Sequence, residues 1–301
     1  MLCRGQFIVP CFLFPQLIRL FMRSVISYKA VCLIILLYCV EAATGQELYV
    51  FTEPASNMPA RSIAAKLTSR FQKGYHSSSF EQRYAPEIML GLNKNLMLHA
   101  ATSFSDMYST SLRWESTWLY AKYRFLTVDN IHRHFRLAVF GEYAYSRNDL
   151  FYDELSLQGD QSGWQGGMIA TQLLNKLALS STLSLLKVTS EKPEVNPDVY
   201  PYSAFNYSLS AGYLLLPFNY TDFNQTNLNL YVELLGQQTL DKSLFYTDLA
   251  PAIQLIFNSN FKVNAGYRFQ LNSNMHRMSE NSWLVSIERT FLNAIQRRKK
   301  G

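Results

Sequence analysis

Residues 249–271, LAPAIQLIFNSNFKVNAGYRFQL, carry the clearest alternation of apolar and polar residues in the chain. From position 261 to position 271 every odd residue is apolar, and every even residue is polar or glycine. Side chains alternate across a β-strand, so this run predicts a strand with one apolar face and one polar face. Residues 249–257 carry a second apolar row at odd positions, and the Asn-Ser-Asn of residues 258–260 is typical of a turn. The stretch therefore predicts a β-hairpin.

The same alternation recurs along most of the chain. It begins at Ile63 and ends at Phe291, in about twelve segments, and several are longer than the roughly five or six residues usual in soluble sheets. Strands that cross a membrane at a tilt need about 9–11 residues. The pattern therefore predicts an all-β fold, a closed antiparallel transmembrane β-barrel of about 12 strands over residues 62–291.

The connections between these segments supply a second test of the barrel. Membrane barrels alternate long outer loops with short periplasmic turns. The long loops are expected around residues 72–79, 104–111, 147–161, 188–202, 237–248 and 271–281. Short turns are expected at residues 93–95, 174–176 and 258–260, whereas two turns, near 126–134 and 217–226, are expected to be longer than the rule. Pro86 predicts a bulge or irregular pairing, and Pro251 is expected at the outer start of its strand.

The N-terminal region has the pattern of a secretory signal peptide. Arg23 and Lys29 precede an apolar run at residues 30–40, and small residues follow at 43–45. The apolar run is shorter than the roughly 20 residues of a membrane-spanning helix, although a signal anchor is the alternative. We therefore expect residues 1–45 to be a signal peptide, with Met22 as the true start. Residues 46–61 are expected to form a periplasmic lead-in, and residues 292–301 a basic C-terminal tail.

Export and strand length decide which way the apolar face points. An exported chain of long strands is expected to turn its apolar face to lipid, because a closed barrel satisfies its backbone hydrogen bonds within a bilayer. A soluble, lipocalin-like barrel with the apolar face inside is the alternative. The predicted location is the bacterial outer membrane, with outer-membrane lipid as a partner. The formal net charge is only +6, and no basic block precedes the tail, so a nucleic-acid partner is not expected.

The polar face then lines the lumen and carries the candidate functional residues. The lumen-lining candidates are Lys66, Arg70, Arg83, Glu87, Lys122, Arg124, Arg136, Glu142, Glu233, Lys262, Arg268 and Glu288. They allow two interpretations: cross-strand pairing that holds the barrel together, or a path for small polar or anionic solutes. We expect a passive channel, not an enzyme, without cofactor or metal. The alternatives are a non-conducting structural or assembly barrel and an outer-membrane phospholipase-type enzyme, which would need a histidine and a serine on the lipid face.

Two resemblances add to this interpretation. Residues 283–291, WLVSIERTF, resemble the C-terminal strand of bacterial outer-membrane proteins, which implies the barrel-assembly machinery as a partner, although here residues 292–301 follow Phe291. The chain also resembles the phenol-degradation (meta-pathway) transport-channel family. That similarity lies in Pro54 and Pro59 and in the hairpin series around residues 84–104, YAPEIMLGLNKNLMLHAATSF. It implies a passive pore for small molecules.

Overall fold

The computed structural model describes residues 49–74, 80–189, 200–218 and 225–295, which belong to one compact unit, residues 42–301. The predicted signal peptide and residues 296–301 of the basic tail lie outside these ranges. Within them, no helix is both long enough and apolar enough to cross a membrane.

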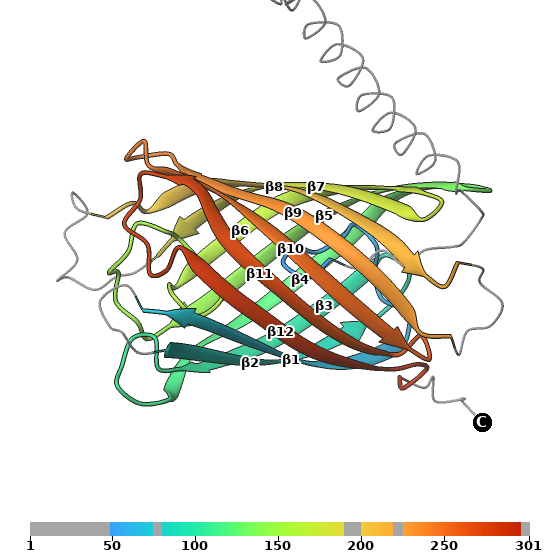
Figure 1. The fold of residues 1–301 in the computed structure, drawn as a ribbon, viewed down its shortest axis with the longest axis horizontal. Helices are drawn as coiled ribbons and strands as arrows, with labels where there is room; N and C mark the ends of the chain where they lie inside the picture. The colour runs from blue at the N-terminus through green and yellow to red at the C-terminus, as the bar shows by residue number, and fades with distance from the viewer. Residues whose placement is uncertain (1–48, 75–79, 190–199, 219–224, 296–301) are drawn as a thin grey trace, which may run out of the picture. The chain divides into compact units, whose positions relative to one another are not determined.

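Twelve antiparallel strands form a closed barrel, in which β1 pairs with both β2 and β12 (Figure 1). The strands are β1 (Ser62–Lys73), β2 (Phe80–Gly91), β3 (Leu96–Ser105), β4 (Arg113–Asn130), β5 (Arg133–Ser146), β6 (Gly163–Leu174), β7 (Leu177–Val188), β8 (Ser203–Leu216), β9 (Asn227–Thr239), β10 (Phe245–Phe257), β11 (Phe261–Ser273) and β12 (Asn281–Phe291). Each strand pairs with its neighbour in sequence, so the topology is a simple up-and-down meander. The predicted fold class is confirmed.

The hairpin predicted over residues 249–271 is formed by β10 and β11. Phe257 pairs with Phe261, and Asn258 and Ser259 take positive φ angles in the turn between them. Adjacent residues of β10 show the alternation directly: Ile253 is 47% exposed on the outside and Gln254 is 1% exposed on the inside. The two faces therefore lie as the sequence pattern predicted.

The connections separate the barrel into two ends. The end that holds residues 106–112, 147–162 and 274–280 is called the loop end here, and the other is the turn end (Figure 1). One expectation was wrong: the connection near residues 126–134 is not long. Strand β4 continues to Asn130 and β5 begins at Arg133, so only two residues join them. Thr127 pairs with Arg136 and Val128 with Phe135, which extends the sheet through the region expected to be a loop.

Both prolines are accommodated inside strands. Pro86 pairs with Leu67 of β1, and the pairing of β2 with β3 is interrupted beside it without any register shift. Pro251 lies within β10 opposite Val232, where the pairing with β11 is interrupted, and not at the start of the strand as expected. Proline has no N–H to donate, so it fits where one side of the ladder is open.

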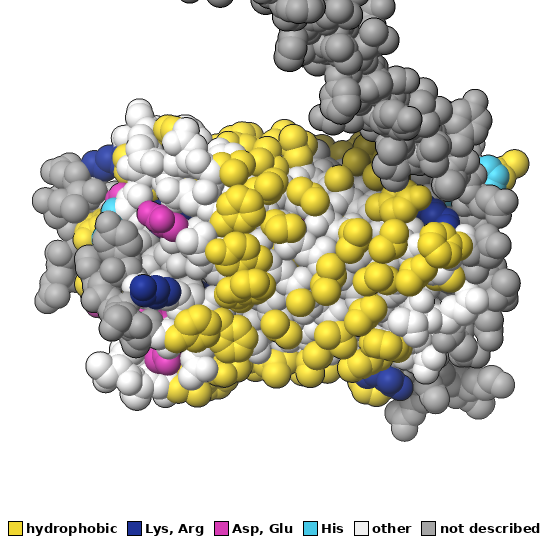
Figure 2. Space-filling view, viewed as in Figure 1, with side chains coloured by type: hydrophobic (Ala, Val, Ile, Leu, Met, Phe, Trp, Pro, Cys, Tyr) yellow, Lys and Arg dark blue, Asp and Glu magenta, His cyan; other side chains and the backbone are white. Residues whose placement is uncertain are grey.

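The polarity of the barrel is the inverse of that of a soluble protein. Apolar side chains cover the outer face in a broad band across the strands (Figure 2). The interior holds buried polar residues from every part of the sheet, including Ser208, Asn229, Gln254 and Asn264. An apolar exterior around a polar interior is the arrangement of a transmembrane β-barrel.

Candidate functional site

The twelve predicted lumen residues all stand on inward-facing strand positions, and most of them are paired. Lys66 Nζ lies 3.7 Å from Glu87 Oε2, and Lys262 Nζ lies 2.6 Å from Glu288 Oε1. Arg124 donates to the Lys94 carbonyl at the turn end. The two ion pairs are cross-strand contacts, in agreement with one of the two interpretations that the sequence allowed, whereas Arg124 contacts a turn.

Residues 49–60 are called the inner segment here; the chain enters the barrel along them, and residues 50–53 line its interior cavities (Figure 1). Glu233 of β9, which is fully buried, accepts hydrogen bonds from the backbone N–H groups of Val50 and Phe51, both at 2.9 Å. Its other oxygen accepts a 2.6 Å bond from the Thr52 hydroxyl. Residues 46–61 were expected to form a periplasmic lead-in, and no place in the lumen was predicted for them.

Lys122 of β4 holds the middle of the inner segment from the opposite wall. Its ammonium group donates to the carbonyls of Pro54 and Ser56, at 2.7 and 2.9 Å, and to Glu53 Oε2 at 3.1 Å. Arg136 of β5 donates to the Ser56 hydroxyl at 2.6 Å. Two of the predicted lumen cations therefore bind the chain's own backbone and side chains.

Apolar contacts add to this attachment. Tyr49, Val50 and Phe51 pack in one cluster with buried residues of the inner wall, among them Tyr231 and Leu284. The Phe51 ring lies so close to residue 266 that a Cβ there would come within 2.6 Å of it. Glycine at position 266 therefore makes room for the inner segment.

The connection between β5 and β6, residues 147–162, folds into the barrel from the loop end and is called the inner loop. Leu150, Leu155 and Leu157 are buried against the wall. Asp160 Oδ1 accepts a 2.6 Å bond from Arg83, and Glu154 Oε1 accepts a 2.8 Å bond from Arg268. The inner loop therefore carries carboxylates to basic residues of the barrel wall.

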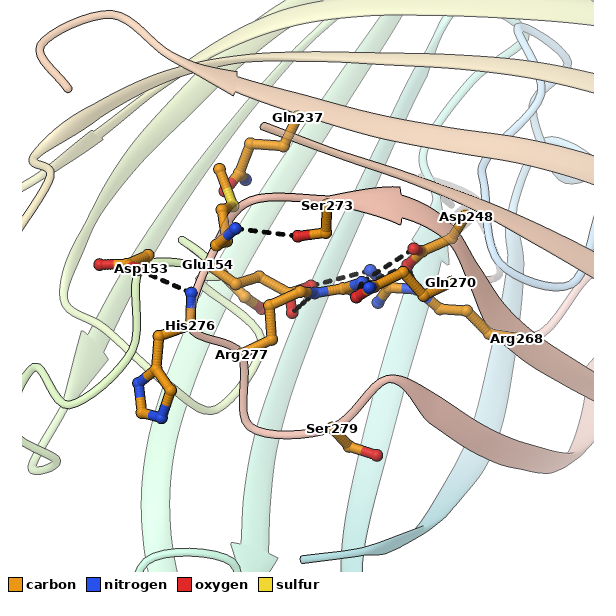
Figure 3. Close-up of polar contacts among 12 residues, drawn as sticks. Asp153, Glu154, Gln237, Asp248, Arg268, Gln270, Ser273, His276, Arg277 and Ser279 are labelled. Atoms are coloured by element: carbon orange, nitrogen blue, oxygen red, sulfur yellow. Dashed lines mark hydrogen bonds and ion pairs between the residues drawn. The ribbon is translucent and has the colours of Figure 1, made fainter. Parts of the chain in front are cut away.

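Glu154 belongs to a larger charge network (Figure 3). Arg277, from the connection between β11 and β12, donates to Glu154 Oε2 at 2.9 Å and to both oxygens of Asp248, at 2.8 and 2.7 Å. Arg268 also contacts Asp248, at 2.5 Å, and both guanidinium groups lie over the Tyr246 ring. Asp248 has the inward parity of β10, so the strand pattern could have found it. Nothing in the sequence marks Glu154 or Arg277, because both lie in loops.

The inner segment and the inner loop are together called the inserts here. Two adjoining cavities of about 280 and 120 Å³ lie between them. The larger extends from residues 278–282 at the loop end to Phe51, Thr52 and Glu53 of the inner segment. Arg70 and Glu142 line both cavities. Phe51, Thr52 and Glu53 of the inner segment line both cavities too, so a solute in this space would meet the barrel wall and the inner segment together.

The two inserts carry carboxyl groups with strongly shifted pKa values. Burial raises the pKa of Glu53, but the attraction of Lys122, His99 and Lys66 outweighs it and lowers the pKa from 4.5 to about 2. Burial opposes ionisation of Glu154 in the same way, but Arg277 and Arg268 hold its pKa well below the usual range. Both carboxylates are therefore charged at neutral pH.

Histidines do not assemble a catalytic or metal site in the described ranges. His99 points inward, with Nδ1 2.6 Å from Glu87 Oε1, and His134 lies 2.8 Å from Asp129 near the turn end. Residues 49–74, 80–189, 200–218 and 225–295 contain no cluster of three or more side chains able to hold a metal ion.

No family model matches the chain, and no curated protein matches it in sequence. Solved structures do match it. An outer membrane channel from Pseudomonas putida F1 is 11% identical and aligns over 81% of this chain and 100% of its own, with a TM-score of 0.54. The two chains share a fold. The KdgM and NanC porins, each 10% identical, align over 76% and 75% of this chain and 99% and 98% of theirs, with TM-scores of 0.47 and 0.49.

Proposed function

We propose that the protein is a passive channel of the bacterial outer membrane for small polar solutes. The observation that carries the proposal is a membrane-type barrel whose polar interior holds a cavity reaching from the loop end to the inner segment. A barrel that served only as a rigid support would not need an interior cavity lined by ionisable side chains such as Arg70 and Glu142. The similarity to the Pseudomonas putida channel supports the fold on which this function rests.

The two inserts bear on the size of the path. The inner segment and the inner loop both occupy the lumen, and the cavity between them measures about 280 Å³. A path of this size favours small solutes over the larger molecules that wide porins admit. We therefore expect a low single-channel conductance that increases when the inner segment is removed.

Planar-bilayer recording tests the proposal. The mature chain is refolded into detergent and inserted beside a variant that lacks residues 46–60, and folding of both is verified by heat-modifiable mobility on gels. Small, discrete current steps from the wild type and larger steps from the deletion variant are expected. Two folded proteins that both fail to conduct would contradict the channel.

The second candidate is a non-conducting structural or assembly barrel. The observation in its favour is the dense attachment of the inner segment by Glu233 and Lys122, which resembles a permanent seal. This second candidate predicts that the wild type carries no current in planar bilayers, whereas the variant lacking residues 46–60 conducts. An outer-membrane phospholipase has less support, because His99 points into the lumen and not to lipid.

We also propose that the chain is related to the phenol-degradation transport channels. Support comes from Pro54 and Pro59, two of the residues that carry the resemblance. Both lie in the inner segment, where the Pro54 carbonyl accepts from Lys122 and the Pro59 carbonyl accepts from Ser62. The family's passive-pore role agrees with the channel proposed here.

Insertion by the barrel-assembly machinery through β12 is part of the same proposal, and truncation after Phe291 tests whether the tail impedes this insertion.

A further inference from the structure

Arg70 of β1 differs from the other basic residues that were predicted to line the lumen. Each of the others contacts a carboxylate, a carbonyl oxygen or a hydroxyl group; they are Lys66, Arg83, Lys122, Arg124, Arg136, Lys262 and Arg268. Arg70 makes neither a hydrogen bond nor an ion pair with any residue of the described ranges. Its guanidinium group therefore holds no part of the barrel in place.

The position of Arg70 is also electrostatically unfavourable. Arg83 of β2 lies directly opposite it in the β1–β2 pairing, and Arg268 of β11 lines the same cavity. Both positive charges repel Arg70. The carboxylates of the inner loop are bound to these neighbours instead: Asp160 lies 2.6 Å from Arg83. Glu154 lies 2.8 Å from Arg268. Like charges directly opposite destabilise a sheet, so the presence of Arg70 lowers the stability of this wall.

The guanidinium group of Arg70 is open to the interior space. Arg70 is half-buried and lines both cavities. None of its side-chain nitrogens is among the fully buried atoms that lack a partner. The rings of Phe51 and Tyr120 line both cavities as well. A small molecule in this space can therefore reach a positive charge, with apolar surface available in the same cavities.

We propose that Arg70 binds a small organic monoanion, a carboxylate, in the larger cavity. This inference rests on the proposed channel and names the solute class of its lumen. The planar guanidinium group takes the two carboxylate oxygens in a two-pronged contact. Natural proteins break rules of stability mainly at functional sites. Binding of an anion accounts for a like-charge contact that no structural partner of Arg70 relieves.

Most acids that line the larger cavity are already neutralised or stand on distant strands. Glu154 and Asp160 are bound to arginines, and Glu53 is bound to Lys122 at 3.1 Å. Glu142 stands on β5, and β2, β3 and β4 lie between that strand and β1 in the sheet. The cavity volume of about 280 Å³ limits the anion at Arg70 to a small molecule.

Propionate and propionamide provide a matched pair of probes, because they have nearly the same size and shape and differ in charge. Their dissociation constants are measured by ligand-observed NMR titration of the refolded full barrel in uncharged detergent at low salt. The wild type is expected to bind propionate about tenfold more tightly than propionamide, the effect of one contact between charged groups. Arg70→Gln is expected to remove this preference. Arg289→Gln is the control and should keep it, since Arg289 is exposed on the outer face of β12.

Gel mobility after graded heating separates this role from a structural one. Arg70→Gln is expected to leave the temperature of the mobility change unaltered or to raise it, because the variant loses no partner and relieves repulsion. Arg83→Gln should lower that temperature, because Glu115 and Asp160 lose the arginine that binds them. A drop in Arg70→Gln as large as the drop in Arg83→Gln would make Arg70 a structural residue and overturn the proposal.

The binding measurement can overturn the proposal in two further ways. Equal affinity of the wild type for the two probes would do so, and so would a preference for propionate that survives in Arg70→Gln. Failure of Arg70→Gln to fold would likewise show that Arg70 is structural. Because binding is measured without current, a silent bilayer record would refute the channel alone, whereas the absence of a preference for propionate would refute only this site.

Discussion

At the residue scale, Lys122 shows how a buried charge is used inside the barrel. Its side chain is fully buried, and its three donors are directed to acceptors of the inner segment. An ammonium group in such a place is tolerated only because each donor has a partner. Lys122 therefore links β4 to a stretch of chain that has no strand pairing of its own.

Lys122→Met is expected to release the inner segment. The change leaves two backbone carbonyls and Glu53 without their donor, and each hydrogen bond to a charged group contributes about 1.5–3 kcal/mol. Single-channel conductance should increase toward that of the variant lacking residues 46–60. Lys176→Met is the control, because Lys176 is also buried but donates to Pro217 and Phe218 at a turn. An equal increase in both variants would show that the effect is a general loosening of the barrel.

Gly159 is a residue that the inner loop requires. Its φ angle is +118°, and a Cβ there would lie 2.6 Å from Arg83 Cζ. Gly159→Ala is therefore expected to displace the inner loop from Arg83 and to weaken folding by about 1–3 kcal/mol, the usual cost of such a conformation. Gel mobility after graded heating measures the change. Gly141→Ala is the control, because a Cβ at position 141 meets open space, and it should leave the temperature of the mobility change unaltered. If Gly159→Ala also left that temperature unaltered, the inner loop would not require glycine at position 159.

The alternation of apolar and polar residues along the strands predicted which strand side chains line the lumen, but it did not predict the contacts of the inner segment and the inner loop. A one-residue step moves a strand side chain to the other face, so residues such as Arg70, Glu142 and Lys262 could be placed inside from alternation alone. Glu154 and Arg277 could not, because a loop has no period that fixes the direction of a side chain. Their partnership depends on how far the inner loop folds into the barrel, which only the assembled wall determines.

At the element scale, the inner segment is the part that local sequence could least predict. Its two prolines and its lack of alternation excluded a strand, and a lead-in outside the barrel was the simplest expectation. Its position depends on Lys122, Thr171 and Glu233, three residues on different strands far along the chain. Only closure of the barrel brings those side chains around one stretch of backbone.

The attachment of the inner segment is expected to weaken in acid. Glu53 has a pKa of about 2 in the folded protein and 4.5 as its ordinary value. A carboxyl group whose pKa is lowered by folding stabilises fully above its ordinary value, and this contribution is lost as the pH falls toward the folded value. Conductance should therefore be constant from neutral pH to about 5 and increase between about 4.5 and 2.

Glu53→Gln tests the assignment of this acid response. The variant lacks the carboxylate, so its conductance should already be increased at neutral pH and should change less between pH 4.5 and 2. Glu81→Gln, which removes a carboxyl group from β2 outside the inner segment, should keep the wild-type response. A wild-type acid response that persists unchanged in Glu53→Gln would assign it to another group.

At the scale of the whole molecule, the inverted polarity follows from the repeating pattern and needed no loop information. Every strand repeats the same division into two faces, and closure sends one set of side chains outward together. The strand count, the order of strands and the lipid-facing band could all be predicted because they depend on a period of two residues. The exact ends of β4 and β5 could not, since their last pairs lie beyond the clear alternation.

The apolar band is expected to make folding depend on lipid. Leu183 lies midway along β7 and is 50% exposed, whereas Leu292 is 56% exposed just beyond the end of β12. Arginine at the bilayer midplane destabilises a membrane barrel by about 2–4 kcal/mol, and near the interface by about 0–1 kcal/mol. Urea titration of folding into lipid vesicles should therefore show a large loss for Leu183→Arg and a small one for Leu292→Arg. A soluble barrel would tolerate arginine at either exposed position, so equal and small losses would mean that this face meets water.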